Sequence, residues 1–215
     1  MNVLIGHGES GKVYQINDST IRKVYNDRRT FLKERQFLKI LNDNNVQRTA
    51  KMTSFSYKNK TIDMPFIPYN LENIIKDCDN IHMKNLDICM IITELLSIMI
   101  ELHNNNIYHG DFKAKNIQIN QKKLPIIIDF DLSEYNNNSD YVGDLNKLKL
   151  LIIQLLFKTE YPETWPRKAY YLQLIEKELP ELKDLLQSKS YNINDLVSYF
   201  NNESNKKMII DFINN

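Results

Sequence analysis

The feature that most constrains the fold is a change of hydrophobic pattern close to Pro65 and Pro68. Before these prolines, short apolar runs alternate with turn residues, a pattern typical of strands, and one helical pattern interrupts them. After them the pattern is mainly helical. Because proline breaks regular structure, we predict a linker here. The predicted strands are residues 3–5, 12–16, 20–25, 50–57 and 60–67, and the helix among them covers 28–41.

The second part of the chain reads as a helical lobe with two short strands, "IQI" and "PIIID". We therefore expect an α+β protein with two lobes, residues 1–69 and residues 70–215, and a cleft between them. In the larger lobe the periodicity predicts helices at about 71–77, 84–104, 144–158, 167–178 and 180–188, followed by further helical segments toward the C-terminus.

Composition narrows the function classes. The 28 Lys+Arg and 27 Asp+Glu nearly balance, which argues against a general nucleic-acid-binding surface but leaves room for a local basic patch. Cys78 and Cys89 imply no disulfide framework and fit a reducing compartment. The N-terminus does not resemble a signal peptide, and the most apolar segment, residues 86–103, carries three acidic residues and reads as an amphipathic helix. We expect a cytoplasmic or nuclear protein without a membrane partner.

The segment "IGHGESGKVY" has glycines at positions 6, 8 and 11 between two apolar runs. Glycine lets the backbone approach a phosphate group closely, although a plain Gly-rich hairpin gives the same pattern. The spacing from Gly6 to Lys12 also nearly matches a Walker A loop. That loop needs Ser or Thr next and then a helix, whereas this chain has Val13 and a strand pattern. We therefore predict a strand–loop–strand arrangement.

Lys23 and Glu34 form a candidate ion pair. Lys23 shares one face of its predicted strand with Ile21 and Tyr25. Glu34 falls on the apolar stripe of the next helix, where an unpaired carboxylate would be costly. Lys23 is the nearest suitable cation in the sequence, and such a pair would hold its ammonium ready for a phosphate. The alternative is that Glu34 lies at the edge of the stripe, in water.

The strongest signal is "HGDFKAKN", followed by "IIIDFD", whose first Asp lies thirteen residues after the Asn. In this combination the chain resembles a protein kinase in near-minimal form, over residues 1 to about 158. The matching residues are Gly6, Gly8, Gly11 and Val13 in the Gly-rich loop, Lys23 and Glu34 as the Lys–Glu pair, His109, Asp111, Lys113 and Asn116 in the catalytic loop, and Asp129 and Phe130 in the metal-binding motif.

The resemblance implies a role for each charged or polar group. Asp111 would accept or orient the proton of the substrate hydroxyl, while Asn116 and Asp129 would hold magnesium, which prefers oxygen ligands. Lys113 would steady the γ-phosphate of ATP, and Lys23 its α- and β-phosphates.

The resemblance also implies an adenine site and a structural carboxylate. Met64 would lie at the back of the adenine pocket, with backbone groups near Pro65 and Ile67 at the adenine edge. Asp144 would brace the catalytic loop through its backbone, although a simple helix N-cap would also explain it. Val13 and Ile21 complete the predicted nucleotide-binding residues.

Three features depart from the family. Gly110 stands where many regulated kinases have Arg, so we predict no phospho-switch that depends on that Arg. Asp131 replaces the Gly of Asp-Phe-Gly and adds a negative charge near the metal site. About a dozen residues separate Asp131 from Asp144, and no Ala-Pro-Glu follows, so the peptide-binding platform is reduced or missing.

These departures make the chain similar to vaccinia-related and other viral kinases, and also to the small kinase-like ATPase of the tRNA threonylcarbamoylation complex. Lys113 favours the protein-kinase side. The prediction is a phosphotransferase that depends on ATP and Mg²⁺ and acts on Ser or Thr hydroxyls of proteins. The alternatives are a non-catalytic nucleotide-binding partner module and a kinase-like ATPase or kinase that acts on small molecules or is linked to tRNA or the ribosome.

Overall fold

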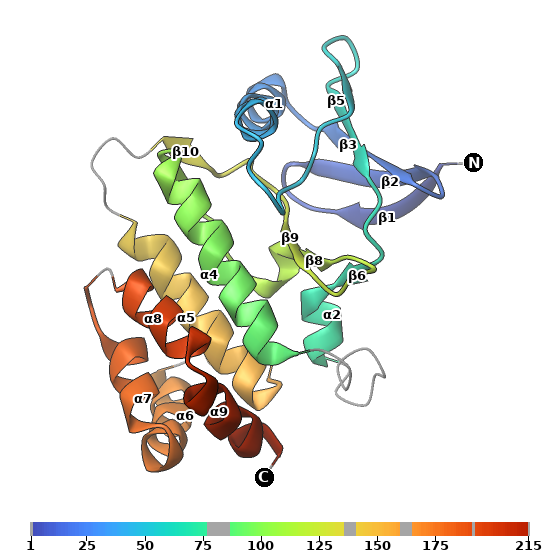
Figure 1. Ribbon diagram of the computed structural model, residues 1–215. Coiled ribbons are helices and arrows are strands. Elements are labelled where there is room, and N and C mark those ends of the chain that lie inside the picture. Colours follow the sequence, from blue (N-terminus) through green and yellow to red (C-terminus); the bar gives the residue numbers. More distant parts are fainter. Residues whose placement is uncertain (1, 77–86, 136–140, 160–164, 191, 215) are drawn as a thin grey trace.

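The computed structural model describes residues 2–76, 87–135, 141–159, 165–190 and 192–214. It has the predicted α+β architecture in two lobes (Figure 1). The N-terminal lobe contains an antiparallel sheet and one long helix, α1. The C-terminal lobe is mainly helical. Its small sheet, made of β6 (Tyr69–Asn70), β8 (Ile117–Ile119) and β9 (Pro125–Ile127), lies next to the N-terminal lobe (Figure 1).

The sheet of the N-terminal lobe has five strands in the order β1-β2-β3-β5-β4, all antiparallel to their neighbours. β1 and β2 flank the Gly-rich segment, which confirms the predicted strand–loop–strand arrangement. Gly11 opens β2 so close to β3 that a Cβ atom there would collide with the carbonyl oxygen of Val24. The strands are β1 (Val3–His7), β2 (Gly11–Asn17), β3 (Thr20–Tyr25), β4 (Ser54–Ser56) and β5 (Thr61–Pro65).

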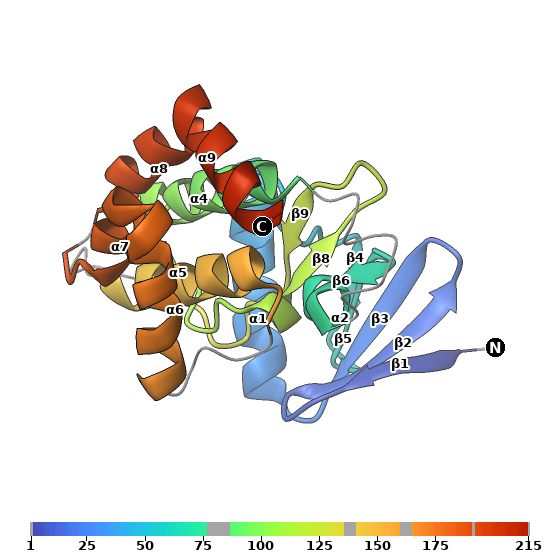
Figure 2. The ribbon, with the colours of Figure 1, turned by 90° about the horizontal axis from the view of Figure 1, so that it is seen from below.

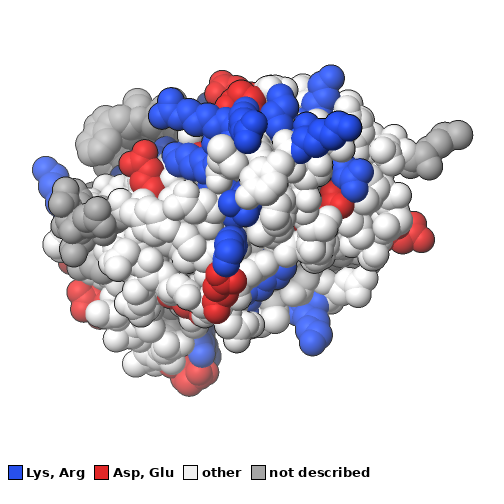
Figure 3. All heavy atoms as spheres, turned by 90° about the horizontal axis from the view of Figure 1, so that it is seen from above, with Lys and Arg blue, Asp and Glu red and all other residues white. Residues whose placement is uncertain are grey.

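Helix α1 (Arg28–Asp43) begins at Asp27, whose side chain accepts a hydrogen bond from the backbone N–H of Thr30. Its buried face consists of apolar residues and Glu34. Its outer face is basic, and Figure 3 shows Lys and Arg side chains following this helix. Although the charges of the whole chain nearly balance, a local basic patch is therefore present on α1.

The C-terminal lobe is built around α4 (Ile88–Asn104), which packs against α5 (Val142–Phe157) and α8 (Ile193–Asn201) (Figures 1 and 2). Asp87 caps α4 by accepting from the N–H of Met90, and residues 84–86 of the predicted helix lie outside the described residues. The helices are α2 (Leu71–Lys76), α4 (Ile88–Asn104), α5 (Val142–Phe157), α6 (Trp165–Glu178), α7 (Pro180–Gln187), α8 (Ile193–Asn201) and α9 (Glu203–Asn214).

Short strands connect segments of the chain where the two lobes meet. β8 (Ile117–Ile119) and β9 (Pro125–Ile127) are the two predicted strands of the C-terminal lobe, and they pair with each other. Ala50 donates its backbone N–H to Ile127 at 2.8 Å, so the chain after α1 is tied to β9. Periodicity could not predict the two-residue strands β6 (Tyr69–Asn70), β7 (Ile107–Tyr108) and β10 (Glu134–Tyr135), because they are too short to show any.

Among the described helices, none combines the length and the apolar character needed to cross a membrane. Cys89 is a free, buried thiol on α4, and Cys78 lies outside the described residues.

Candidate active site

The ammonium of Lys23 on β3 lies between carboxylates of both lobes. Its Nζ is 2.6 Å from Glu34 Oε2 on α1 and 2.5 Å from Asp129 Oδ1, which follows β9. The side chains of Lys23 and Glu34 are almost fully buried. The predicted Lys23–Glu34 pair is therefore present, and the alternative of a solvated Glu34 is wrong.

Two further donors fix Glu34. The hydroxyl of Tyr25 donates to Oε2 at 2.8 Å, and the backbone N–H of Phe130 donates to Oε1 at 3.3 Å. Burial by itself would lower the pKa of Lys23, but the charges of Glu34 and Asp129 outweigh burial and raise this pKa. The ammonium is therefore charged at any pH at which the protein works.

The catalytic loop brings three of the predicted residues together. Asn116 ends a short 3-10 turn (Ala114–Asn116) and donates from Nδ2 to Asp111, both to the backbone oxygen at 2.9 Å and to Oδ2 at 2.8 Å. Lys113 Nζ lies 2.7 Å from the same Oδ2. Within the described part of the chain, no hydrogen bond engages Asp111 Oδ1 or Asn116 Oδ1. Each side chain therefore keeps one oxygen for a ligand.

Asp144 braces this loop from α5. Its carboxylate accepts from the backbone N–H groups of His109, at 2.7 Å, and Gly110, at 3.1 Å. Asp144 lies inside the first turn of α5, and Tyr141 occupies the N-cap position. The N-cap alternative for Asp144 is therefore wrong, and the bracing expectation is met.

The buried ring of His109 forms hydrogen bonds to the chain near Asp111 and to the chain near Asp129. Burial lowers its pKa, although the charge of Asp144 opposes this effect, so the ring is neutral near pH 7. Nδ1 accepts from the N–H of Asp111 at 3.2 Å, and Nε2 lies 3.1 Å from the carbonyl oxygen of Ile128. A neutral ring protonated on Nε2 satisfies both contacts. It therefore links the Asp111 segment to the Asp129 segment.

Gly110 has a backbone φ of +82°, and a Cβ atom there would lie 2.8 Å from the carbonyl oxygen of Leu132. Both constraints favour glycine. The carbonyl of Leu132 therefore leaves no room for a side chain at position 110, and an arginine there would strain the backbone.

The segment around Asp129 carries more negative charge than Asp129 alone supplies. Glu34, Asp129 and Asp131 each offer a carboxylate oxygen, and these oxygens lie within 4.8 Å of one another. Asp131 Oδ2 is 3.9 Å from Lys23 Nζ. Lys23 is the cation beside these three carboxylates and offsets the charge of one of them. The donor set of carboxylate and amide oxygens at Asp129 and Asn116 suits magnesium.

The remaining predicted nucleotide-binding residues lie on the N-terminal lobe. In the sheet Val13 pairs with Lys23, and Ile21 with Met64, which is buried. Pro65 and Ile67 are at the end of β5 and just beyond it. Gly6 lies in β1, whereas a Cβ atom at Gly8 would meet no atom within 4 Å.

The sequence analysis assigns no role to two residues that hold this site, Tyr25 and Ser133. Tyr25 was placed on the same strand face as Lys23, and this spacing could have suggested a second donor to Glu34. Ser133 is fully buried and donates to the carbonyl oxygen of His109 at 3.1 Å. No sequence pattern marks Ser133, because its partner is a backbone group.

Comparison with known proteins agrees with this geometry. A family model described as the protein kinase domain matches residues 1–147, a range that includes every residue from the Gly-rich loop to Asp144. No curated protein matches the chain.

Proposed function

Because the chain belongs to the protein kinase family, we propose that it is an ATP- and Mg²⁺-dependent kinase that phosphorylates Ser or Thr hydroxyls of proteins. Residues 1–69 would bind most of the nucleotide, and residues 70–215 would supply the catalytic loop. The observation that carries the proposal is the position of Lys23 Nζ, within 2.6 Å of both Glu34 and Asp129. A non-catalytic module would have no need to keep this pair together with Asp111 and Asn116.

Bound ATP would supply the phosphoryl group, and magnesium would neutralise charge on its phosphates. The residues fit both groups. Asn116 keeps Oδ1 for a cation while its Nδ2 is held by Asp111. Asp129 is one-third exposed and bonds to Lys23 through Oδ1, which leaves Oδ2 for the metal. Lys23 is placed to exchange its contact with Asp129 for phosphate oxygens while Glu34 retains it.

Asp111 is the proposed base. Its Oδ2 is occupied by Asn116 and Lys113, so Oδ1 is the atom that would receive the proton of the acceptor hydroxyl. The hydroxyl oxygen would then bond to the γ-phosphorus as the bond from that phosphorus to ADP breaks. Lys113, which is half-exposed, can turn from Asp111 to the transferred phosphoryl group.

The test is phosphate transfer from γ-labelled ATP to two mixed protein substrates, one acidic and one basic, followed by phosphoamino-acid analysis. The proposal expects label on serine or threonine of an added protein, and no label when magnesium is chelated. Label only on a small molecule would support the small-molecule alternative. Release of inorganic phosphate without labelled protein would support an ATPase, and nucleotide binding without turnover would support a non-catalytic module.

A further inference from the structure

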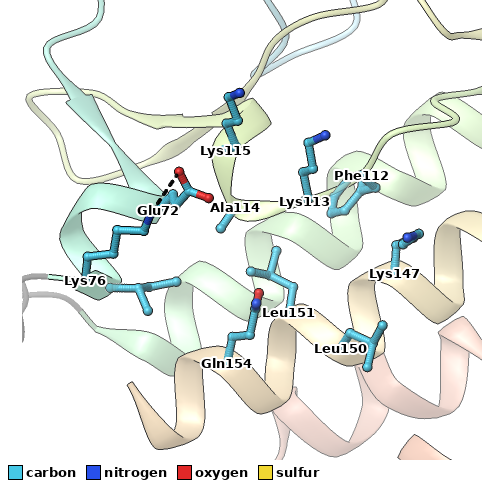
Figure 4. A pocket seen from close by; sticks show the side chains of 11 residues that line it. Glu72, Lys76, Phe112, Lys113, Ala114, Lys115, Lys147, Leu150, Leu151 and Gln154 are labelled. Carbon is cyan, nitrogen blue, oxygen red and sulfur yellow. Dashed lines mark ion pairs between the residues drawn. The ribbon is translucent and has the colours of Figure 1, made fainter. Parts of the chain in front are cut away.

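A hollow of about 390 Å³ lies beside the catalytic loop, between α2, residues 112–115 and α5 (Figure 4). Part of its wall is apolar, with Phe112 and Leu151 among the lining residues. Lys113, which belongs to this lining, is 2.7 Å from Asp111 Oδ2. The hollow is therefore next to the carboxylate of Asp111, the proposed base, and a bound acceptor would extend into it.

The lining is strongly basic. It contains Lys76, Lys113, Lys115 and Lys147, against one carboxylate, Glu72. The whole chain has a net charge of only +1, so this concentration is local. Figure 4 shows Lys113 and Lys115 extending from the catalytic loop toward the same side, with Lys147 rising from α5.

Two of these lysines are available to a ligand. Lys76 lies 3.6 Å from Glu72, and Lys113 is engaged by Asp111. Lys115 and Lys147 are exposed, and the described residues offer neither ammonium an ion pair. Clustered ammonium groups without counter-charges attract anions, and the low-dielectric wall strengthens that attraction.

On these grounds we propose that the hollow selects protein acceptors with acidic residues next to the phosphorylated hydroxyl, and that Lys115 and Lys147 are the specificity-determining residues. This inference rests on the proposed kinase function. The hollow would also bind the acceptor in a chain that has only about a dozen residues between Asp131 and Asp144 and no Ala-Pro-Glu.

A peptide fits this hollow better than a nucleic acid does. Proteins that bind single strands combine basic grooves with exposed aromatic faces on which bases stack. The only aromatic residue in the described lining is Phe112, whose surface is 1% exposed. The apolar part of the wall instead suits the aliphatic portions of peptide side chains.

The test uses four peptides of equal length, each with one serine. The residues that flank the serine are glutamate, phosphoserine, glutamine or lysine, and kcat/KM is measured for each. We expect glutamate or phosphoserine to exceed glutamine by about tenfold, the size expected for two exposed ion pairs, and lysine to be poorest. Glutamate and phosphoserine are compared to learn which anion the site prefers. Equal rates for all four would overturn the inference and leave the proposed function standing.

The double variant K115E/K147E tests whether the hollow is the source of selectivity. It should lose the preference for glutamate over glutamine, mainly through a higher KM, and gain activity toward the lysine peptide. The matched control is Lys177→Glu, an exposed lysine on α6, which should keep the wild-type preference. Unchanged selectivity in K115E/K147E would overturn the inference.

A binding measurement separates this inference from the proposed function. A fluorescent glutamate-flanked peptide with alanine in place of serine should bind wild-type protein and lose about tenfold in affinity with K115E/K147E. Such binding without phosphoryl transfer to any peptide would support the hollow as an anion site and refute the kinase activity. Tighter binding of a single-stranded RNA, lost in the same double variant, would overturn the choice of a peptide.

Discussion

Lys23 Nζ lies 2.5 Å from Asp129 Oδ1, although the two residues are 106 positions apart in the chain. The same ammonium is 2.6 Å from Glu34 Oε2. A single cation of the N-terminal lobe thus joins a helix of that lobe to the segment after β9. Nucleotide and magnesium would compete for the Lys23–Asp129 contact, whereas the Lys23–Glu34 contact can persist.

Lys23→Met should abolish phosphoryl transfer and also destabilise the fold. Removing the cation leaves buried Glu34 without its ion-pair partner, which costs about 3–5 kcal/mol in comparable buried pairs. The double variant K23M/E34Q should recover part of that stability, because glutamine buries no charge, but it should not recover activity. Urea unfolding and a kinase assay measure both effects. Wild-type activity in Lys23→Met would remove Lys23 from the nucleotide site.

Asp111→Asn should reduce kcat by roughly 10²–10⁴-fold, the usual contribution of a positioned acid–base group. The change in stability should be small, because Asp111 is partly exposed and an amide can still accept from Asn116. Asp195→Asn, an exposed substitution on α8, serves as the control and should behave as wild type. Turnover of Asp111→Asn within threefold of wild type would mean that another group takes up the proton.

Asp144→Asn should lower kcat without a matching rise in the KM for ATP. The new amide group faces two backbone N–H groups, those of His109 and Gly110, and can accept from only one of them. The unsatisfied donor should cost about 1–3 kcal/mol of stability and loosen the Asp111 loop. Steady-state kinetics and thermal unfolding test this. A loss of stability with unchanged kcat would limit Asp144 to a structural role.

Gly8→Ala and Gly11→Ala should separate nucleotide binding from folding. At Gly11 a Cβ atom would meet the Val24 carbonyl, so this substitution should lower the melting temperature clearly. A Cβ atom at Gly8 would meet no atom within 4 Å, so the melting temperature should not change. If the segment approaches phosphates closely, Gly8→Ala should raise the KM for ATP. An unchanged KM would argue that Gly8 does not contact the nucleotide.

The buried His109 should contribute to the pH dependence of stability. Burial lowers its pKa in the folded protein, so below about pH 6.5 the unfolded chain binds more protons at this position. The free energy of unfolding should therefore fall as the pH drops from 7 to 5. His109→Gln should show a shallower fall, and the exposed control His7→Gln should match wild type. Equal slopes in all three proteins would mean that His109 is not the group responsible.

Much of the fold could be predicted because local pattern determines it. The strands around Lys23, the helix with Glu34 on its apolar stripe and the pair "IQI" and "PIIID" all follow from periodicity, and the structure contains each of them. The same pattern placed a carboxylate on a buried face, and the cost of burying it unpaired pointed to Lys23.

Tertiary structure alone decided the contacts made by backbone groups and the local concentration of charge. Ser133 donates to a backbone oxygen of the catalytic loop, and backbone groups are the same at every position, so no residue pattern reveals this pairing. The bracing by Asp144 was expected from the family resemblance and not from periodicity. Lys115 and Lys147 lie 32 positions apart in the chain, and they line one hollow only because α5 lies beside the catalytic loop. Side-chain periodicity reports which face of an element is buried, whereas the assembly of a charged hollow depends on how separate elements pack.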